Sequence, residues 1–210
     1  FFATITILFF SPFLIIIILI LLLTGEQEVF YLQERVGRYS KPFKIWKFAT
    51  MVKNSPNLGT GDVTMRNDPR VLPFGKLLRI SKINEIPQLI NIIIGDMSIV
   101  GPRPLMKEGY DRYDEEIKSK IYNIKPGLTG IGSIIFRDEE KIITNSKLKP
   151  HQCYKEVILP YKGEIELWYQ KNQNFFVDTK IIFCTIWVVL FKNSKIHRKL
   201  FKSLPKGKFF

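Results

Sequence analysis

The first 23 residues, Phe1 to Leu23, carry no charged side chain, and a Ser-Pro step, Ser11-Pro12, lies in the middle of the stretch. At about 1.5 Å of rise per residue, a helix of this length just reaches across a bilayer core of about 30 Å. Proline lacks a backbone donor and clashes with the carbonyl four residues before it, so a helix is expected to kink or break here. The sequence therefore places the chain at a membrane and leaves open whether it crosses.

Three interpretations of this segment compete. A secretory signal peptide is disfavoured, because the apolar run is long and no small-x-small cleavage site precedes Thr24-Gly25. A single spanning helix is one alternative, since neighbouring groups often compensate for a proline. The other is a helix-break-helix over residues 1–24 that enters one leaflet and returns. Because the sequence starts at Phe1 rather than Met, we expect a segment upstream, whose Lys and Arg content would bear on orientation.

The charge balance indicates an anionic partner. Thirty-two Lys and Arg against 19 Asp and Glu give a net charge of +13, which suits phospholipid headgroups, a phosphorylated substrate or nucleic acid. No nucleic-acid module is recognisable, and the apolar N-terminus favours lipid; a merely solvated surface is the plainer alternative. Cys153 and Cys184 lie far apart and predict no disulfide framework, which fits a reducing compartment. His151 and His197 are too few for a His/Cys zinc site.

Residues 25–191 suit one compact domain, followed by a basic tail over residues 192–210. Aromatic and branched residues predict two short strands around a Gly-Pro-containing turn, Val29–Arg35 and Phe43–Phe48. Apolar spacing and charge predict helices over Leu72–Ile80, Ile83–Ile94 with a C-cap at Gly95, Tyr110–Ile121 and Ile181–Phe191. A polar loop is expected over residues 53–64. The predicted fold class is α+β and mainly helical, with a small β-hairpin and interfacial amphipathic helices.

The tail from Lys192 onward contains seven Lys or Arg and no acidic residue. Apolar side chains are interleaved with these cations, at Leu200, Phe201, Leu204 and Phe209. Such a segment is expected to bind an anionic leaflet, at about 1 kcal/mol per basic residue close to the surface. A disordered, solvated end is the alternative.

The most chemically suggestive segment is Asn84-Glu85 at the start of the long predicted helix. We expect Asn84 to be the N-cap, and Pro87 is tolerated because first-turn amides have no partner within the helix. A helix start attracts phosphate, and Arg79 lies close enough in sequence to contribute a bidentate contact. Glu85 would then hold a divalent metal or move a proton. Alternatively, Glu85 only complements the helix dipole.

Six segments now follow one another in a characteristic order: Lys47-Phe48-Ala49-Thr50-Met51, Asn67-Asp68-Pro69-Arg70, Gly75-Lys76-Leu77-Leu78-Arg79, Asn84 to Asn91, Gly95-Asp96-Met97-Ser98-Ile99-Val100-Gly101-Pro102-Arg103-Pro104, and Lys125-Pro126-Gly127-Leu128-Thr129-Gly130. Together they resemble the bacterial sugar transferase family, the monotopic phosphoglycosyl transferases that begin surface-polysaccharide and glycoprotein glycan assembly. Each motif is weak alone, but the ordered set is specific. The resemblance extends from the Ser-Pro step to about Phe191.

The resemblance implies a reaction at the cytoplasmic face of the bacterial inner membrane. A sugar 1-phosphate would move from a UDP-sugar to undecaprenyl phosphate, and UMP would be released, with Mg²⁺ as cofactor. It also implies that the N-terminal helix is re-entrant and broken at Ser11-Pro12. The expected partners are thus the donor, the lipid acceptor and an anionic phospholipid membrane, with no nucleic acid. The oligomeric state is left open, a homodimer being one option.

Roles are carried over position by position. The family's phosphate-binding cations correspond to Lys47, Arg79 and Arg137. The Pro-Arg-Pro element that faces the nucleotide base corresponds to Pro102, Arg103 and Pro104. The plain alternatives are that Lys47 and Arg79 are surface charges and that Pro-Arg-Pro is only a stiff turn.

One departure from the family pattern bears on the mechanism. The family's catalytic pair is Asp-Glu, in which Asp is the nucleophile and a metal ligand, and here it is Asn84-Glu85. An amide is a poor nucleophile and a weak Mg²⁺ ligand. We therefore expect Glu85 to act as nucleophile or general base, with Asp68 or Asp96 helping to hold the metal. The alternatives are an inactive homologue that binds a nucleotide sugar or a transferase partner, and a basic lipid-binding peripheral protein.

Overall fold

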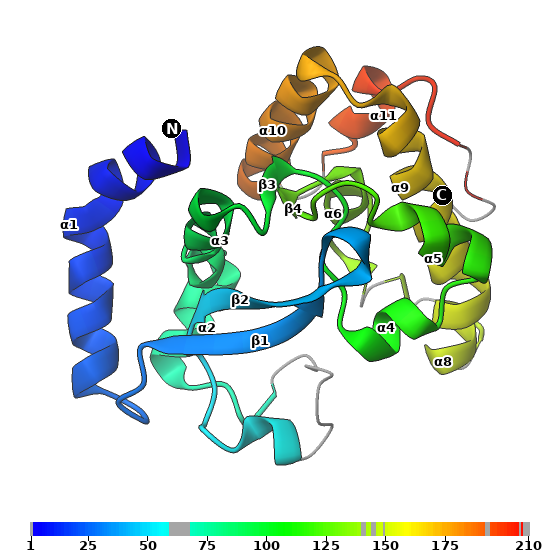
Figure 1. Cartoon of the computed structure of the whole chain (residues 1–210). Coiled ribbons are helices and arrows are strands. Elements are labelled where there is room, and N and C mark those ends of the chain that lie inside the picture. The colour runs from blue at the N-terminus through cyan, green and yellow to red at the C-terminus, as the bar shows by residue number, and fades with distance from the viewer. Residues whose placement is uncertain are drawn as a thin grey trace. The chain divides into compact units, whose positions relative to one another are not determined.

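A computed structural model describes residues 2–58, 68–139, 142–143, 146–148, 150–191, 194–205 and 207 (Figure 1). The fold is α+β and mostly helical, with 57% helix and a small antiparallel hairpin, which confirms the expected class. The chain forms two compact units. The N-terminal unit comprises Phe1–Glu34 and Lys44–Gly95, and the C-terminal unit comprises Arg35–Phe43 and Asp96–Phe210.

The N-terminal helix α1 extends from Phe2 to Leu23 and includes Pro12. The helix is continuous, so the expected break at Ser11-Pro12 is instead a bend in its N-terminal part (Figure 1). Local chemistry explains the continuity: Pro12 has no N–H to donate to the Leu8 carbonyl, and the Ser11 hydroxyl donates to it instead, at 2.8 Å. Within the described residues, α1 is the one helix long and apolar enough to cross a membrane.

The other elements of the N-terminal unit follow the predicted order. The strands of the hairpin are β1 (Phe30–Val36) and β2 (Pro42–Phe48), with a 3₁₀ turn over Arg38–Ser40 between them. A 3₁₀ turn over Ser55–Asn57, α2 (Pro73–Ile80), a 3₁₀ turn over Ile83–Glu85 and α3 (Gln88–Ile94) complete the unit. Residues 59–64 of the expected polar loop lie outside the described residues.

A small core holds this unit together. Ile17 and Leu21 of α1 pack with Phe48 of β2 and Leu78 of α2, and all four are nearly inaccessible. Burying such side chains stabilises the fold by about 1.5–3 kcal/mol each. One face of α1 therefore belongs to the unit's core, while much of the rest of the helix is exposed.

The predicted helix over Ile83–Ile94 is shorter than expected at its start. Only α3 is α-helical, beginning at Gln88 immediately after Pro87, and the preceding residues form the 3₁₀ turn. Its end confirms the prediction: Gly95 has a φ of 93°, and its amide bonds to the carbonyls of Asn91 and Ile92.

The elements of the C-terminal unit are β3 (Ser98–Val100), α4 (Lys107–Asp111), α5 (Glu115–Ile121), β4 (Gly127–Thr129), α6 (Ile131–Ile135), α8 (Pro150–Cys153), a π-helical turn (Tyr154–Ile158), α9 (Leu159–Asn172), α10 (Phe175–Leu190) and α11 (Ile196–Leu200). The prediction of a single helix over Tyr110–Ile121 is wrong, because this region contains two helices. The first helix ends at Asp111, the extended Asp114 precedes the second helix, and Tyr113 beside it is buried. The strands β3 and β4 pair in parallel, Ser98 with Gly127 and Val100 with Thr129.

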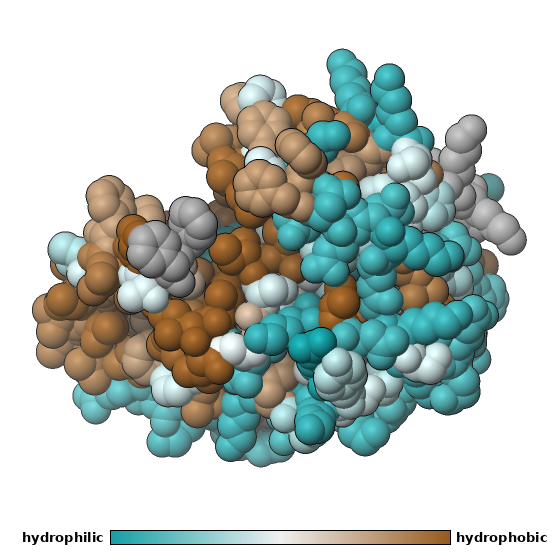
Figure 2. Space-filling model, turned by 45° about the horizontal axis from the view of Figure 1, so that its top comes forward, coloured by the Kyte–Doolittle hydropathy of each residue, from teal (hydrophilic) through white to brown (hydrophobic). Residues whose placement is uncertain are grey.

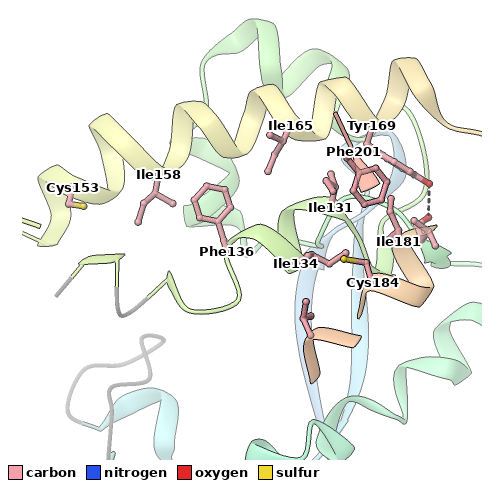
Figure 3. Packing of buried hydrophobic residues seen from close by; sticks show 12 residues of the cluster. Ile131, Ile134, Phe136, Cys153, Ile158, Ile165, Tyr169, Ile181, Cys184 and Phe201 are labelled. Atoms are coloured by element: carbon pink, nitrogen blue, oxygen red, sulfur yellow. Dashed lines mark hydrogen bonds between the residues drawn. The ribbon is translucent and has the colours of Figure 1, made fainter. Parts of the chain in front are cut away.

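The main core of the C-terminal unit lies among α6, α9 and α10 (Figure 3). Ile165 and Tyr169 of α9 are fully buried against Ile131 of α6 and Ile181 of α10. The two cysteines, Cys153 and Cys184, are buried and free, which confirms that they form no disulfide.

The basic tail contributes to this same core. Phe201 is buried, its ring meets that of Trp168 edge-on at 6.0 Å between centroids, and Leu200 and Leu204 pack against the cluster. These three side chains therefore face the protein, and the expectation that they bind a leaflet is wrong for them. Phe209 lies outside the described residues.

Helix α10 (Phe175–Leu190) is apolar on several faces, but only one of its faces is buried. Ile181, Cys184 and Val188 are buried, whereas exposed apolar side chains cover its other faces, including Phe183, Ile186, Val189 and Leu190. Figure 2 shows hydrophobic side chains over α1, and it shows them over α10 as well. The helix expected at Ile181–Phe191 is thus longer, from Phe175 to Leu190, and one of its faces belongs to the core, as predicted.

Candidate functional site

The Asn84-Glu85 pair lies on a 3₁₀ turn and not at a helix N-cap. Lys82 enters the turn in the left-handed conformation, with a φ of 61°, and the Glu85 amide donates to the Lys82 carbonyl. Asn84 is buried and caps no helix, and its Oδ1 has no hydrogen-bond partner among the described residues. The expectation that Asn84 caps the long helix is therefore wrong, because Pro87 delays the α-helix to Gln88. Glu85 is half-buried beside it.

Lys47 lies on β2 and Arg79 on α2, and Thr50, just after β2, forms hydrogen bonds with Arg79 of α2 and with Leu72 just before it. Thr50 follows β2, its carbonyl accepts the Leu72 amide at 3.0 Å, and its hydroxyl accepts from Arg79 Nη1 at 3.5 Å. A Cβ on Gly75 would lie 2.2 Å from the Thr50 oxygen, so α2 approaches this backbone too closely for any side chain there. The motifs containing Lys47 and Arg79 therefore form one framework, with both cations half-buried.

Asp68 is not available as a metal ligand in the way expected. Both of its carboxylate oxygens accept from Arg70, Oδ1 from Nε at 2.9 Å and Oδ2 from Nη2 at 2.6 Å. Both side chains are buried, and Arg70 also donates to the carbonyls of Ser55 and Leu58, each at 2.8 Å. This ion pair anchors the chain before α2.

The residues around Glu85 can still accommodate Mg²⁺. No group of three or more His, Cys, Asp or Glu within the described residues is arranged to hold a metal. Mg²⁺ does not require one, since it commonly binds one or two protein oxygens together with substrate phosphates. The unpartnered Oδ1 of Asn84 and the neighbouring Glu85 carboxylate are such oxygens. Asp96, half-buried at the start of the C-terminal unit, is the remaining candidate from the sequence.

In the C-terminal unit, Arg103 is exposed between two buried prolines, Pro102 and Pro104. Its main chain is held from two sides. The Tyr122 hydroxyl donates to the Arg103 carbonyl at 2.7 Å, and the Arg103 amide donates to the carboxyl of Glu166. The main chain of Arg103 is therefore fixed, while its side chain is exposed at the surface of the unit.

The Gly-Pro-Arg-Pro and Lys-Pro-Gly-Leu-Thr-Gly motifs are adjacent in space. A Cβ on Gly127 would lie 2.1 Å from the Gly101 nitrogen, and one on Gly130 would lie 2.1 Å from the Gly101 oxygen. The Gly101 amide donates to the Thr129 carbonyl at 2.9 Å. The glycines of both motifs are thus required by backbone contact, which sets the position of Pro102 and Arg103.

Arg137 lies just after α6 and is half-buried. Its Nη2 is 2.7 Å from Asp138 Oδ2, and its Nη1 donates to the Val188 carbonyl near the end of α10. The structure therefore ties this guanidinium to α10.

Two residues that support Arg103, Tyr122 and Glu166, were not identified from the sequence. Tyr122 follows a charged helix, and Glu166 lies among mixed charges on α9, so neither stands in a recognisable motif. The sequence offers one weak signal for Glu166: it occupies a position on the helix face that carries the apolar residues Ile158, Ile165 and Tyr169, which indicates a buried carboxyl.

An apolar, largely exposed N-terminal helix and cations fixed at the ends of packed elements are features of membrane-associated proteins that bind phosphate groups. The match to known proteins is specific: residues 1–192 match the model of the bacterial sugar transferase family. The chain belongs to this family.

Relatives in this family share about a third of the sequence. A UDP-N-acetylgalactosamine-undecaprenyl-phosphate N-acetylgalactosaminephosphotransferase of Aeromonas hydrophila is 31% identical over 90% of this chain and 41% of its own length. A UDP-glucose:undecaprenyl-phosphate glucose-1-phosphate transferase of Escherichia coli (strain K12) is 35% identical over 88% of this chain and 38% of its own length. An uncharacterized sugar transferase, EpsL, of Bacillus subtilis (strain 168) is 33% identical over 77% of this chain and 70% of its own length. The chain thus spans about two fifths of the two named phosphotransferases.

Proposed function

We propose that the chain transfers a sugar 1-phosphate from a UDP-sugar to undecaprenyl phosphate at the cytoplasmic face of the inner membrane, with release of UMP. The observation that carries the proposal is the family match over residues 1–192, with relatives named for this reaction on two different UDP-sugars. The exposed, positioned Arg103 and the joined motifs of Lys47 and Arg79 give the chain cations for a diphosphate donor.

Glu85 is the residue proposed to act on the reacting groups. In a direct displacement, it accepts a proton from the lipid phosphate, whose oxygen attacks the phosphorus that carries the sugar. The bond from this phosphorus to the bridging oxygen breaks, and UMP leaves with the bonding electrons. In the covalent variant, the Glu85 carboxylate attacks first and UMP leaves, and the lipid phosphate then displaces Glu85 from the phosphosugar.

Mg²⁺ would be held by Glu85 and Asn84 Oδ1 together with donor phosphates, and would supply neutralisation of their charge. The protein's own contribution is positioning: Lys47 and Arg79 are proposed to bind phosphate oxygens, with Arg137 as a third cation. Pro102, Arg103 and Pro104 are proposed to bind the nucleotide.

The test is UMP release by the purified protein in lipid discs with Mg²⁺, undecaprenyl phosphate and a panel of UDP-sugars. Lipid-dependent UMP from one donor supports the proposal and names the sugar. A stoichiometric burst of UMP without lipid identifies the covalent variant. If folded protein that still binds UDP-sugars releases no UMP from any donor in the panel, the proposal is replaced by an inactive, nucleotide-sugar-binding homologue.

We also propose that α1 is re-entrant, which makes the protein monotopic, and that it lies in an anionic leaflet. The bend in the N-terminal part of α1 (Figure 1), the presence of Pro12 inside the helix and the Ser11 hydroxyl, which satisfies the Leu8 carbonyl, support a change of direction within apolar surroundings. Single cysteines at Thr4 and Glu26, in a chain whose own cysteines are buried, test this with a membrane-impermeant maleimide. Labelling of both positions from one side supports re-entry, and labelling from opposite sides establishes a spanning helix.

A further inference from the structure

The main chain of the Pro-Arg-Pro element has few groups by which it can be held. Pro102 and Pro104 have no N–H, so the Arg103 amide is the one backbone donor in the element. The Tyr122 hydroxyl donates to the Arg103 carbonyl at 2.7 Å and accepts from the Leu105 amide at 2.9 Å. One buried phenol thus binds backbone groups on both sides of Pro104.

Glu166 binds the remaining group. Its side chain is only 2% exposed on α9, and its carboxyl accepts the Arg103 amide. A Cβ on Gly132 of α6 would lie 2.2 Å from Glu166 Oε1, so the carboxyl is packed directly on this glycine. Its Oε2 has no partner among the described residues. Burial raises the pKa of Glu166 to about 8, with Lys162 acting in the opposite direction.

These contacts fix the main chain of Arg103, whose own side chain is exposed. A long exposed side chain loses conformational entropy when it is ordered on a ligand. Fixing the main chain on both sides sets the direction of its Cα–Cβ bond and limits the region that the guanidinium reaches. A buried carboxyl with one unpartnered oxygen is a costly way to hold a turn that serves stability alone.

We propose that Glu166 and Tyr122 are positioning residues for Arg103: by fixing its main chain they direct its guanidinium to the nucleotide of the donor. The inference rests on the proposed function, because it takes Arg103 to bind the UMP portion of a UDP-sugar. Neither residue touches the substrate, and both act through Arg103.

The experiment measures two properties in wild type, Glu166→Leu, Glu166→Gln, Tyr122→Phe and the control Glu164→Leu, which changes an exposed glutamate on the same helix. The first is hydrogen–deuterium exchange of a peptide that covers Arg103 and Leu105. The second is the affinity for UMP as probe, also measured in Arg103→Ala and in the double variant Arg103→Ala/Glu166→Leu.

We expect Glu166→Leu to speed exchange at Arg103 and weaken UMP binding by about tenfold, because the Arg103 amide loses its acceptor. Glu166→Gln, which keeps a carbonyl acceptor, recovers most of the loss, and Tyr122→Phe shows a smaller loss in the same direction. In the Arg103→Ala background, Glu166→Leu has no further effect on UMP affinity. The control behaves as wild type.

Three results would overturn the inference. Faster exchange with unchanged UMP affinity would show that Glu166 only stabilises the turn, as would an equal loss with and without the Arg103 side chain. If wild type binds no UMP, the proposed function fails in its nucleotide step and the positioning role fails with it. A wild-type protein that binds UMP but does not turn over any UDP-sugar leaves the positioning role standing and removes the reaction alone. Tyr122→Phe keeps the test decisive if Glu166→Leu does not fold.

Discussion

The Asn84-Glu85 turn and the Pro-Arg-Pro element present their candidate side chains in opposite ways. At Asn84 the main chain is held by main-chain bonds of a 3₁₀ turn, and the side chain is buried with an unpartnered oxygen. At Arg103 the main chain is held by the buried side chains of Tyr122 and Glu166, and the arginine itself is exposed. The first arrangement suits binding of a cation by the Asn84 oxygen, and the second suits binding of an anion by the Arg103 guanidinium.

This difference predicts how each region tolerates substitution. The Asn84 oxygen is buried and Glu85 lies beside it, so a substitution at position 84 or 85 is expected to change the reaction rate. An exposed side chain on a fixed main chain is easily replaced, so a change there alters ligand affinity with little effect on folding. The following predictions test this contrast.

Glu85→Gln has the largest expected effect. It removes the proposed base or nucleophile without changing size, so we expect transfer to fall by about 10²–10⁴-fold with donor affinity retained. UMP release and UDP-sugar binding are measured together. Glu108→Gln, an exposed glutamate on α4, is the matched control and is expected to be fully active. Undiminished transfer by Glu85→Gln would remove this residue from the mechanism.

Asp68→Asn separates the framework from the site. It leaves the buried Arg70 guanidinium without its charged partner, and breaking such a pair costs about 3–5 kcal/mol. We expect a large drop in the midpoint of thermal unfolding and, in the protein that remains folded, an unchanged Mg²⁺ concentration dependence of transfer. An altered Mg²⁺ dependence would return Asp68 to the list of metal ligands.

The sequence predicted the hairpin, α2 and the Gly95 cap because each rests on local chemistry: strand-forming residues around a turn, apolar spacing, and a glycine with positive φ. It did not predict the split between α4 and α5, because burial of Tyr113 outweighs the helical tendency of a charged segment. It also misplaced the start of α3, where Pro87 and the 3₁₀ turn override the N-cap pattern at Asn84.

For the candidate site, sequence identified the exposed and motif-bearing residues and missed their buried supports. Arg103 stands in a motif, whereas Glu166 and Tyr122 support it from 63 and 19 positions away, a relation that only the packing of the C-terminal unit reveals. The partner of Asp68 was missed for the same reason: Arg70, two residues away, is recognisable as its bidentate partner only in the fold.

Asn84→Asp tests whether the turn still suits the family's nucleophile. A carboxylate there would provide both a metal ligand and a nucleophile, and we expect transfer to rise by about tenfold, the equivalent of one charge-assisted contact. The measurement is the rate of UMP release, with a lipid-independent burst as the sign of a covalent intermediate. A loss of activity in the folded variant would show that the site has adapted to the amide.

The smallest effect concerns pH and the Pro-Arg-Pro side of the comparison. The pKa of Glu166 is raised from 4.5 to about 8 by burial, against Lys162, while Tyr113, Tyr122 and Tyr169 also lie within its electrostatic reach. Between these two pKa values the folded protein binds more protons than the unfolded chain, so the contribution of Glu166 to stability is present at low pH and is lost as pH rises to about 8. Thermal unfolding of wild type and Glu166→Gln from pH 5 to 9 measures it: the difference between the two should move in favour of Glu166→Gln as pH rises and level off above about pH 8. A pH-independent difference would mean that Glu166 does not change its protonation in this range, and the contact with Arg103 would then be that of a permanently charged carboxylate.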